Sequence, residues 1–223
     1  MAQAKSRREE YSEATRAALL DAATRLFYEQ GFTGTTLEDV AAAARVTRGA
    51  VYHHFAGKQV LFEAVLERVE LRVVQDVLDR ATAGPDALRA ALVGLEVFLD
   101  HCCDPVYGRL CWREGPLALG WHRWIELEER YAYGVTERLV RGLVESGYLR
   151  SVPLALTTRY AFALLGAAGT ELAEASEEAK PRVRADSSML IRRFLVGLLT
   201  PEAAERSAAL LASTTPPVDH GAS

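Results

Sequence analysis

A basic segment near the N-terminus carries residue types that bind nucleic acid. Between Arg45 and Lys58 the chain has three basic residues and no acidic residue, and threonine, tyrosine and histidine stand among them. Cations and hydroxyl groups contact phosphate oxygens, and an arginine also reads the edge of a guanine in the major groove. The segment is therefore a candidate surface for DNA.

The distribution of charge supports this interpretation better than the total charge does. The 223 residues carry a formal net charge of −4, which by itself argues weakly against DNA binding. Residues 1–58, however, have eight Lys or Arg against seven Asp or Glu, a formal charge of +1, and the remaining residues carry −5. A locally basic face on an acidic chain is compatible with a small head that binds DNA.

Hydrophobic periodicity predicts that the whole chain is helical. Apolar residues recur at intervals of three and four, and glycine or proline stands at the boundaries, most clearly at Gly84–Pro85. We find no convincing strand, no internal repeat and no long linker. The predicted helices span about residues 12–30, 37–44, 48–55, 58–83, 86–102, 106–114, 119–146, 154–175, 181–199 and 201–211.

Two short helices joined by a tight turn, residues 37–44 and 48–55, form a candidate helix-turn-helix. A threonine stands before each of them, where an N-cap is expected. The second helix would present its N-terminal half to a major groove, which is wide enough for one helix. The expected bracing residues are Val40, Ala41, Val46, Val51 and Phe55, and the expected exposed ones are Arg48, Gly49, Tyr52 and His53.

Some of these side chains have an alternative interpretation. Tyr52 could be a core aromatic residue like Phe55, and His53 with His54 could be taken for a metal-binding pair. Adjacent residues on a helix point about 100° apart, so joint ligation by the two histidines is awkward. We therefore interpret His54 as a packed or capping residue.

The helix-turn-helix also matches a known pattern. The runs Thr35–Ala41 and Val46–Phe55 are followed by Gly57–Lys58 and then by Leu61–Phe62. This order of capping threonines, a Tyr-His-Phe cluster and a lysine that opens the next helix resembles the N-terminal part of the TetR family of transcriptional regulators. The run Gly-Pro-Leu-Ala-Leu-Gly-Trp at 115–121 is similar to the body of many family members.

The resemblance implies a fold and a function. The fold is all-α: a three-helix N-terminal helix-turn-helix DNA-binding domain at residues 1–57, a C-terminal helical ligand-binding and dimerisation domain at 58–211, and a disordered tail at 212–223. The function is that of a regulator, not an enzyme. A homodimer would hold a palindromic operator in double-stranded DNA as a repressor, and a small, largely apolar effector in the C-terminal domain would release it.

The resemblance also implies which residues contact DNA. Thr36, Thr47, His53 and Lys58 are expected to hold phosphates, Arg48 and Tyr52 to contact bases, and Gly49 to let the backbone approach closely. The family usually has glycine in the turn where this chain has Arg45, and if this residue must be left-handed, arginine costs on the order of 1 kcal/mol. Arg45 is itself a candidate phosphate contact, and the arm at residues 5–8 could add phosphate or minor-groove contacts.

Aromatic and apolar residues from the middle of the chain form a candidate ligand pocket. Aromatic walls with few polar groups suit apolar molecules, but the same stripe is also what a packed core looks like. Glu128 is expected either to face inward, with Arg159 as one candidate partner, or to lie on the surface. The candidates are Cys102, Tyr107, Leu110, Cys111, Trp121, Trp124, Ile125, Glu128, Tyr131, Phe162 and Leu165.

Small and apolar residues on the last two long helices form a candidate dimer interface. In the TetR family these helices of two subunits make a four-helix bundle, and two heads one DNA turn apart read a palindrome. Packing within one subunit is the alternative interpretation. The candidates are Gly166, Gly169, Ala173, Leu190, Ile191, Phe194 and Leu198.

Other functions are disfavoured by what the sequence lacks. It has no run of about 18 apolar residues and no secretory signal, so we expect no membrane partner and a cytoplasmic location. Cys102, Cys103 and Cys111 are read as reduced thiols, and with His101 and His122 they match no standard metal spacing. We expect no metal and no cofactor. The rival hypotheses are a helical small-molecule or lipid-binding protein whose head has lost DNA function and a metal- or thiol-dependent enzyme or sensor.

Overall fold

The chain folds into helices. The computed structural model describes residues 7–208, and residues 1–6 and 209–223, with the predicted tail, lie outside that part. The described residues form no sheet, and their one β-type pairing is an isolated antiparallel bridge between Leu149 and Leu199. None of the helices within 7–208 combines the length and the apolar character that crossing a bilayer requires. The all-α fold expected from the sequence is confirmed.

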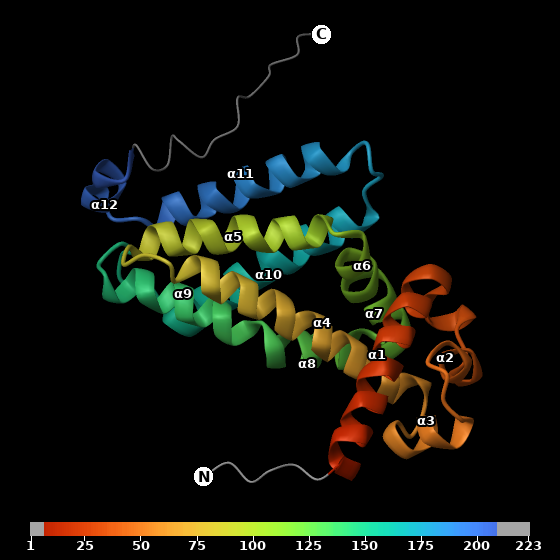
Figure 1. Cartoon of the computed structure of the whole chain (residues 1–223). Coiled ribbons are helices and arrows are strands. Elements are labelled where there is room, and N and C mark those ends of the chain that lie inside the picture. The colour runs from red at the N-terminus through yellow and green to blue at the C-terminus, as the bar shows by residue number, and fades with distance from the viewer. Residues whose placement is uncertain (1–6, 209–223) are drawn as a thin grey trace.

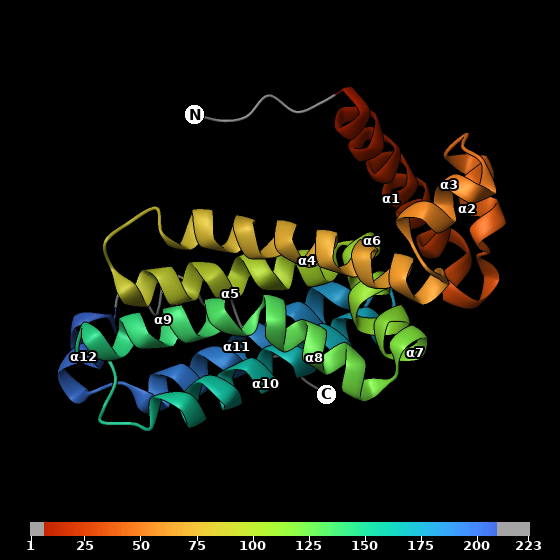
Figure 2. The ribbon, with the colours of Figure 1, turned by 90° about the horizontal axis from the view of Figure 1, so that it is seen from below.

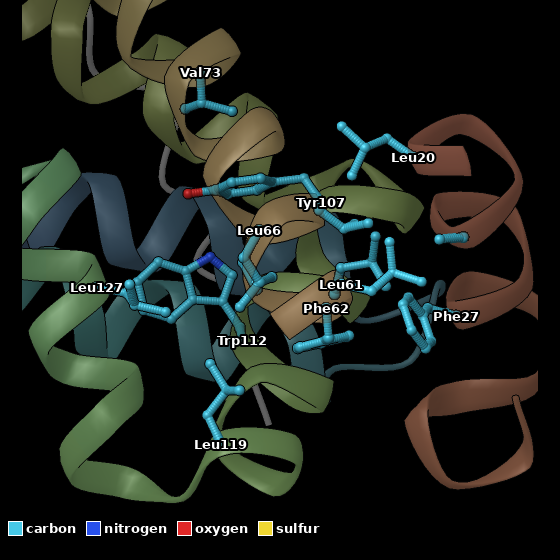
Figure 3. Close-up of a cluster of buried hydrophobic side chains, with 14 of the residues drawn as sticks. Leu20, Phe27, Leu61, Phe62, Leu66, Val73, Tyr107, Trp112, Leu119 and Leu127 are labelled. Carbon is cyan, nitrogen blue, oxygen red and sulfur yellow. The ribbon is translucent and has the colours of Figure 1, made fainter. Parts of the chain in front are cut away.

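Three helices, α1 (Arg7–Gly34), α2 (Leu37–Ala43) and α3 (Arg48–His54), form a head at one end of the molecule (Figure 1). Phe27 of α1 and Val51 of α3 are completely buried in its core. The ring of Phe27 also packs edge-on against Phe62 of the next helix, with centroids 5.0 Å apart. Figure 3 shows this joint, where Leu20 and Phe27 face Leu61 and Phe62. The head core therefore continues into the rest of the molecule.

The sequence predicted that the first helix ends before Gly31, but α1 continues beyond this residue. Gly31 leaves the helical conformation, with φ 74° and ψ 170°, but a further turn follows and ends at Gly34. Glycine adopts a positive φ without the steric cost that other residues have. The glycine was therefore correctly recognised as a break, whereas the turn after it was missed. A Cβ on Gly31 would lie 3.1 Å from the Glu114 carboxylate, so the kink also makes room for a side chain of the body.

Helix α4 (Lys58–Ala81) links the head to the helices that follow, which we call the body. It buries Leu61 and Phe62 near its start, and Val73 and Val77 near its end. The chain then reverses into α5 (Ala87–Cys103), which runs beside α4 (Figures 1 and 2). One continuous helix is therefore packed against the head at one end and against the body at the other.

The middle of the chain is more broken than the sequence predicted. The expected helix 106–114 is divided into α6 (Pro105–Tyr107) and a π-helical segment, η1 (Gly108–Glu114), and α7 (Gly115–Leu119) follows. The single helix predicted for 119–146 is wrong, because α8 (Trp121–Tyr131) and α9 (Tyr133–Glu145) are separate. Gly120 has a positive φ of 76°, and Ala132, between α8 and α9, lies in the right-handed helical region at φ −103° and ψ −25°. The apolar stripe continues across both breaks, so periodicity alone did not reveal them.

Helices α10 (Leu154–Glu174) and α11 (Lys180–Leu198) complete the body, and the short α12 (Pro201–Arg206) follows them. Helix α10 packs on α5, α9, α11 and η1. A second, smaller core that includes Leu88, Leu143 and Leu199 closes the end of the body far from the head (Figure 2). At the other end the body meets α1 of the head through α4, η1 and α7.

Candidate DNA interface and ligand cavity

Local hydrogen bonds determine where the two short head helices begin. Thr36 Oγ1 accepts from the N–H of Asp39 at 3.1 Å, and Asp39 Oδ2 accepts from the N–H of Thr36 at 3.0 Å. Thr47 caps α3 by accepting from the N–H of Ala50 at 3.2 Å. Hydrogen bonds from the Thr36 hydroxyl, and then from its N–H, hold the pKa of Asp39 below its usual value. Each cap contributes about 1 kcal/mol and sets the first residue of its helix.

The turn between α2 and α3 contains a strained arginine. Arg45 has φ 56°, the one positive φ at a residue other than glycine within 7–208. Its N–H donates to the carbonyl of Ala42 at 3.1 Å, and the N–H of Val46 donates to the carbonyl of Ala41 at 3.0 Å. The left-handed conformation that the family glycine implied is therefore present, at a cost on the order of 1 kcal/mol.

One side of α3 is buried and the opposite side is polar. Val51 and Phe55 anchor the helix at 0% and 2% exposure, whereas Tyr52 is 45% exposed, so Tyr52 is not a core residue. Arg48 Nε lies 3.0 Å from a carboxylate oxygen of Glu38 on α2, and its Nη2 donates to the Tyr52 hydroxyl at 3.4 Å. Arg48 and Tyr52 thus lie side by side on the outer face.

The candidate DNA contacts fall into two groups by exposure. Seven of the eight are solvent-exposed: Thr36, Arg45, Thr47, Arg48, Gly49, Tyr52 and His53. Lys58 is different, because its Nζ donates to the carbonyls of Phe32 and Thr35 at 2.8 Å and 3.0 Å and lies 4.4 Å from the centre of the Phe32 ring. This lysine ties the end of α1 to the start of α4. A phosphate here would meet backbone N–H groups of the first turn of α4, not a free ammonium.

The two adjacent histidines form no metal site. His53 is exposed and His54 is half-buried, and their rings meet edge to face with centroids 5.2 Å apart. The pKa of His54 is lowered mainly by burial and, to a smaller extent, by the charges of His53 and Arg16. Within residues 7–208 no three His, Cys, Asp or Glu side chains are grouped so that they could hold a metal ion. His54 is therefore a packed residue of the head.

The body contains a largely apolar cavity of about 520 Å³ that is partly open to solvent, since its lining residue Trp121 is 61% exposed. Helices α4 to α6, η1 and α8 to α11 supply its walls. Cavities of roughly 300–1,000 Å³ hold drug-sized ligands. Seven of the predicted pocket residues line it: Tyr107, Trp121, Trp124, Ile125, Glu128, Phe162 and Leu165.

Four predicted pocket residues lie elsewhere. Cys102, Leu110 and Cys111 are completely buried in the packed core, and Tyr131 is partly buried against that core. They share apolar stripes with lining residues, but a stripe covers more of a helix than the cavity does. The sequence reasoning missed Phe98 of α5 and Trp112 of η1, which do line the cavity.

Two buried acidic residues meet in the cavity wall. Glu128 faces inward at 3% exposure, but its partner is Glu70 of α4, at 2% exposure, and not Arg159. Arg159 instead pairs with Glu129 at 3.0 Å. Burial raises the pKa of Glu70 to about 7. The pKa of Glu128 is raised well above its ordinary value, mainly by burial and next by the charge of Glu70.

Glu70 was missed in the sequence, although it left a signal there. It lies at helical spacing between Leu66 and Val73, two buried residues of α4. A carboxylate at such a position must be buried with its helix face, and burial of an acid usually marks a functional group or a partner.

The cysteines are held in their unreactive form. Burial, followed by the charge of Glu70, raises the pKa of Cys102 and of Cys111 well above the ordinary thiol value. Burial also raises the pKa of Cys103. Because the thiolate is the nucleophile and the redox-active species, these thiols are poor sensors.

The predicted dimer residues divide between two faces. Gly166 and Gly169 point inward, since a Cβ on Gly169 would lie 2.4 Å from the Trp112 ring and one on Gly166 would lie 3.9 Å from it. These glycines make room for the indole, which is the packing within one subunit that the sequence left as the alternative interpretation. Ala173 and Ile191 are partly buried and pack on the core. Ile191 also lines the cavity, as do Phe194 and Leu198.

The outer sides of α10 and α11 are apolar and exposed. On α11, Leu190 is 61% and Phe194 is 36% exposed, and Leu198 is half-buried beside them. The sequence reasoning missed three exposed residues of α10. We call the following set the α10–α11 face: Leu156, Tyr160, Leu164, Leu190 and Phe194.

Comparison with known proteins identifies the family. Residues 19–65 match the family model described as bacterial regulatory proteins, tetR family, and residues 88–198 match the Tetracyclin repressor-like C-terminal domain. Together the two matches include most of the head and most of the body. This chain belongs to the TetR family of transcriptional regulators, which are not enzymes.

Individual relatives extend the likeness. The transcriptional regulator TtgR of Pseudomonas putida is 44% identical over 80 residues, which are 36% of this chain and 37% of TtgR, so this chain spans less than two fifths of that relative. The crystal structure of a TetR-family regulator from Pectobacterium atrosepticum is 26% identical, with a TM-score of 0.76 over 88% of this chain and 98% of its own. The SmeT–triclosan complex is 25% identical, with a TM-score of 0.65 over 85% and 94%.

Proposed function

We propose that this protein is a DNA-binding repressor that holds a palindromic operator as a homodimer and is released by a small ligand in the body. The exposed polar side of α3, anchored through Val51 and Phe55, is the observation that carries the proposal. Gly49 leaves the N-terminal part of α3 unobstructed, so the helix can approach a major groove. Arg48 reads a base edge, worth about 1–3 kcal/mol of discrimination, and Tyr52 contacts a neighbouring base.

Phosphate contacts hold α3 in position. Thr36, Thr47 and His53 are exposed around the ends of α2 and α3, and Arg45 projects from the turn between them. Contacts of this kind fix register and orientation, and they carry no sequence information. They explain why the strain at Arg45 is tolerated, since an arginine in the turn adds a cation beside the DNA. Such a protein acts where its operator is, in the cytoplasm.

The α10–α11 face is the surface on which two copies associate. Exposed side chains such as Tyr160 of α10 and Leu190 of α11 would lose contact with water in a four-helix bundle. A two-fold axis there places two heads on one side of the dimer, so that each enters one half of a palindrome.

The cavity is the ligand site, and two elements link it to the head. Helix α4 contributes Glu70 and Val73 to the wall and Phe62 to the head joint. Segment η1 contributes Trp112 to the wall, while Glu114, two residues later, accepts a hydrogen bond from the N–H of Phe32. The ligand releases DNA only if it binds the released state more tightly than the DNA-bound state. The SmeT–triclosan complex supports a small aromatic molecule as a ligand in this fold.

The test is a mobility-shift titration with the DNA upstream of the protein's own gene. Arg48→Ala and Tyr52→Ala are each expected to weaken binding by about tenfold or more, because each loses a contact worth about 1–3 kcal/mol. Arg138→Ala is the matched control, since Arg138 is an exposed arginine on α9. Circular dichroism verifies that all variants fold. Unchanged binding by both head variants removes α3 as the reading helix.

A further inference from the structure

The two acidic residues in the cavity wall have no cation to balance them. Glu70 Oε1 is buried and has no hydrogen-bond partner among residues 7–208. Arg159 is the one basic residue among the described residues that line the cavity, and Glu129 already pairs with it at 3.0 Å. Tyr107, Cys111 and Glu128 form hydrogen bonds with the Glu70 carboxyl group, but none of them brings a positive charge, so a buried acid pair in a ligand cavity needs a reason.

The other groups that face the pair do not supply a positive charge. Helix α5 contributes Cys102, α6 contributes Tyr107 and η1 contributes Cys111, and burial raises the pKa of all three, so they are neutral at physiological pH. Helix α8 contributes Glu128 itself. Without a ligand, the pair therefore remains close to neutral by keeping protons.

The rest of the wall is aromatic and apolar. Phe98, Trp112, Trp121, Trp124 and Phe162 all line the cavity. The rings of Trp112 and Trp124 meet edge to face with centroids 5.6 Å apart, and those of Trp121 and Trp124 are 5.0 Å apart. Indole faces attract cations, and the same rings pack against flat apolar molecules.

We propose that the cavity takes a lipophilic organic cation: an aromatic or aliphatic body that fills the apolar walls, with one ammonium-type group placed against Glu70 and Glu128. This inference rests on the proposed function, because it names the chemical class of the ligand at that same site. The cation supplies the positive charge that the protein lacks there, and the carboxyl pair gives up a proton as the cation enters. A neutral ligand can donate at most a hydrogen bond to Glu70 Oε1 and brings no positive charge to the pair, and an anion would be repelled.

The inference is tested by calorimetric titration of the full chain with three probes that share one ring system. They are trimethyl(1-naphthylmethyl)ammonium, 1-naphthalenemethanol and 1-naphthylacetate. The cation is expected to bind about tenfold or more tightly than the alcohol, and the anion most weakly. Because Glu70 has a pKa of about 7, cation affinity should rise from about pH 6 to about pH 8, with little change for the alcohol. The heat should depend on the buffer, because protons are released.

Matched variants separate the carboxyl pair from general surface charge. Glu70→Gln and Glu128→Gln preserve the side-chain shape and are each expected to lower cation affinity by about tenfold while leaving the alcohol unchanged. Glu126→Gln is the control, since Glu126 lies on the same helix, outside the cavity, where it pairs with Arg123 at 3.3 Å.

The outcomes distinguish this inference from the proposed function. Equal affinity for cation and alcohol, or no loss in Glu70→Gln, overturns the cation inference and leaves the ligand cavity in place. Failure of all three probes to bind overturns the ligand role of the cavity and, with it, the inference. The mobility-shift titration tests DNA binding independently of both.

Discussion

The carboxylate of Glu114 accepts a hydrogen bond from the backbone N–H of Phe32 at 2.8 Å, which joins the body to the head across 82 positions of sequence. The same carboxylate lies against Gly31, the kink of α1, and Arg109 Nε approaches it at 3.7 Å. Trp112, on the same π-helical segment, lines the cavity. Segment η1 therefore contacts both the cavity and the end of α1 that precedes α2.

Removing the Glu114 acceptor should uncouple the ligand from DNA. Glu114→Ala leaves the N–H of Phe32 without its partner, which costs about 1–3 kcal/mol of stability. We expect ligand affinity in calorimetry to be retained, and the ligand-dependent change in DNA affinity to shrink. Glu114→Gln keeps an accepting oxygen and should restore much of the response. If Glu114→Ala responds to ligand like the wild type, the connection runs through α4 alone.

The strain at Arg45 should be measurable. Arg45→Gly relieves the left-handed conformation and is expected to raise stability by up to about 1 kcal/mol, or about 2–4 °C in Tm. Arg45→Ala removes the side chain but keeps the strained backbone, so its Tm should not rise. Both variants should bind DNA more weakly if Arg45 touches a phosphate. A higher Tm for the alanine variant would place the strain in the side chain.

Gly169 should be intolerant of even one methyl group. Its Cβ would lie 2.4–2.7 Å from three atoms of the Trp112 ring, so Gly169→Ala is expected to destabilise the protein by about 1–3 kcal/mol. Gly134→Ala, in α9, meets no atom within 4 Å and should stabilise by about 0.5–1 kcal/mol through helix propensity. Thermal denaturation compares the two. If Gly169→Ala leaves the Tm unchanged but abolishes the dimer, Gly169 lies in the dimer interface.

Charge on the α10–α11 face should produce monomers. Leu190→Asp places a carboxylate on a side chain that is 61% exposed in one subunit and buried in the proposed dimer. Light scattering is expected to show a monomer, and operator affinity should fall because two heads no longer bind together. Leu117→Asp on α7 is the control, since Leu117 is 76% exposed and lies off this face. Dimers of equal stability in both variants would exclude the face.

The buried acid should make stability depend on pH. The folded-state pKa of Glu70 is about 7, against an ordinary value of 4.5, so the folded state retains a proton that the unfolded chain loses. This contribution to stability is complete below about pH 4.5 and is lost as the pH rises through about 7, by roughly 3 kcal/mol in all. Glu70→Gln should flatten that slope in denaturant titrations. A slope equal to that of the wild type would place Glu70 in a polar environment.

Local chemistry made the head predictable. The capping threonines Thr36 and Thr47, the apolar positions Val51 and Phe55, and the exposed Tyr52 depend on hydrogen bonds and periodicities within a few residues of one another. Such interactions are encoded in short stretches of sequence, so the α2–turn–α3 unit and its outer face could be predicted before the fold was known. The all-α class followed from the same periodicity.

Tertiary packing decided the rest. The pairing of Glu70 with Glu128, the hydrogen bond from Phe32 to Glu114 and the seating of Trp112 on Gly169 each join distant segments. Periodicity shows which side of a helix is apolar, but not which neighbour covers it, so cavity, core and exposed interface share one pattern in sequence. Lys58 shows the same rule for a charged residue, because two carbonyls brought near it by folding hold its ammonium. The helices are encoded locally, whereas the contacts between them depend on how the whole chain packs.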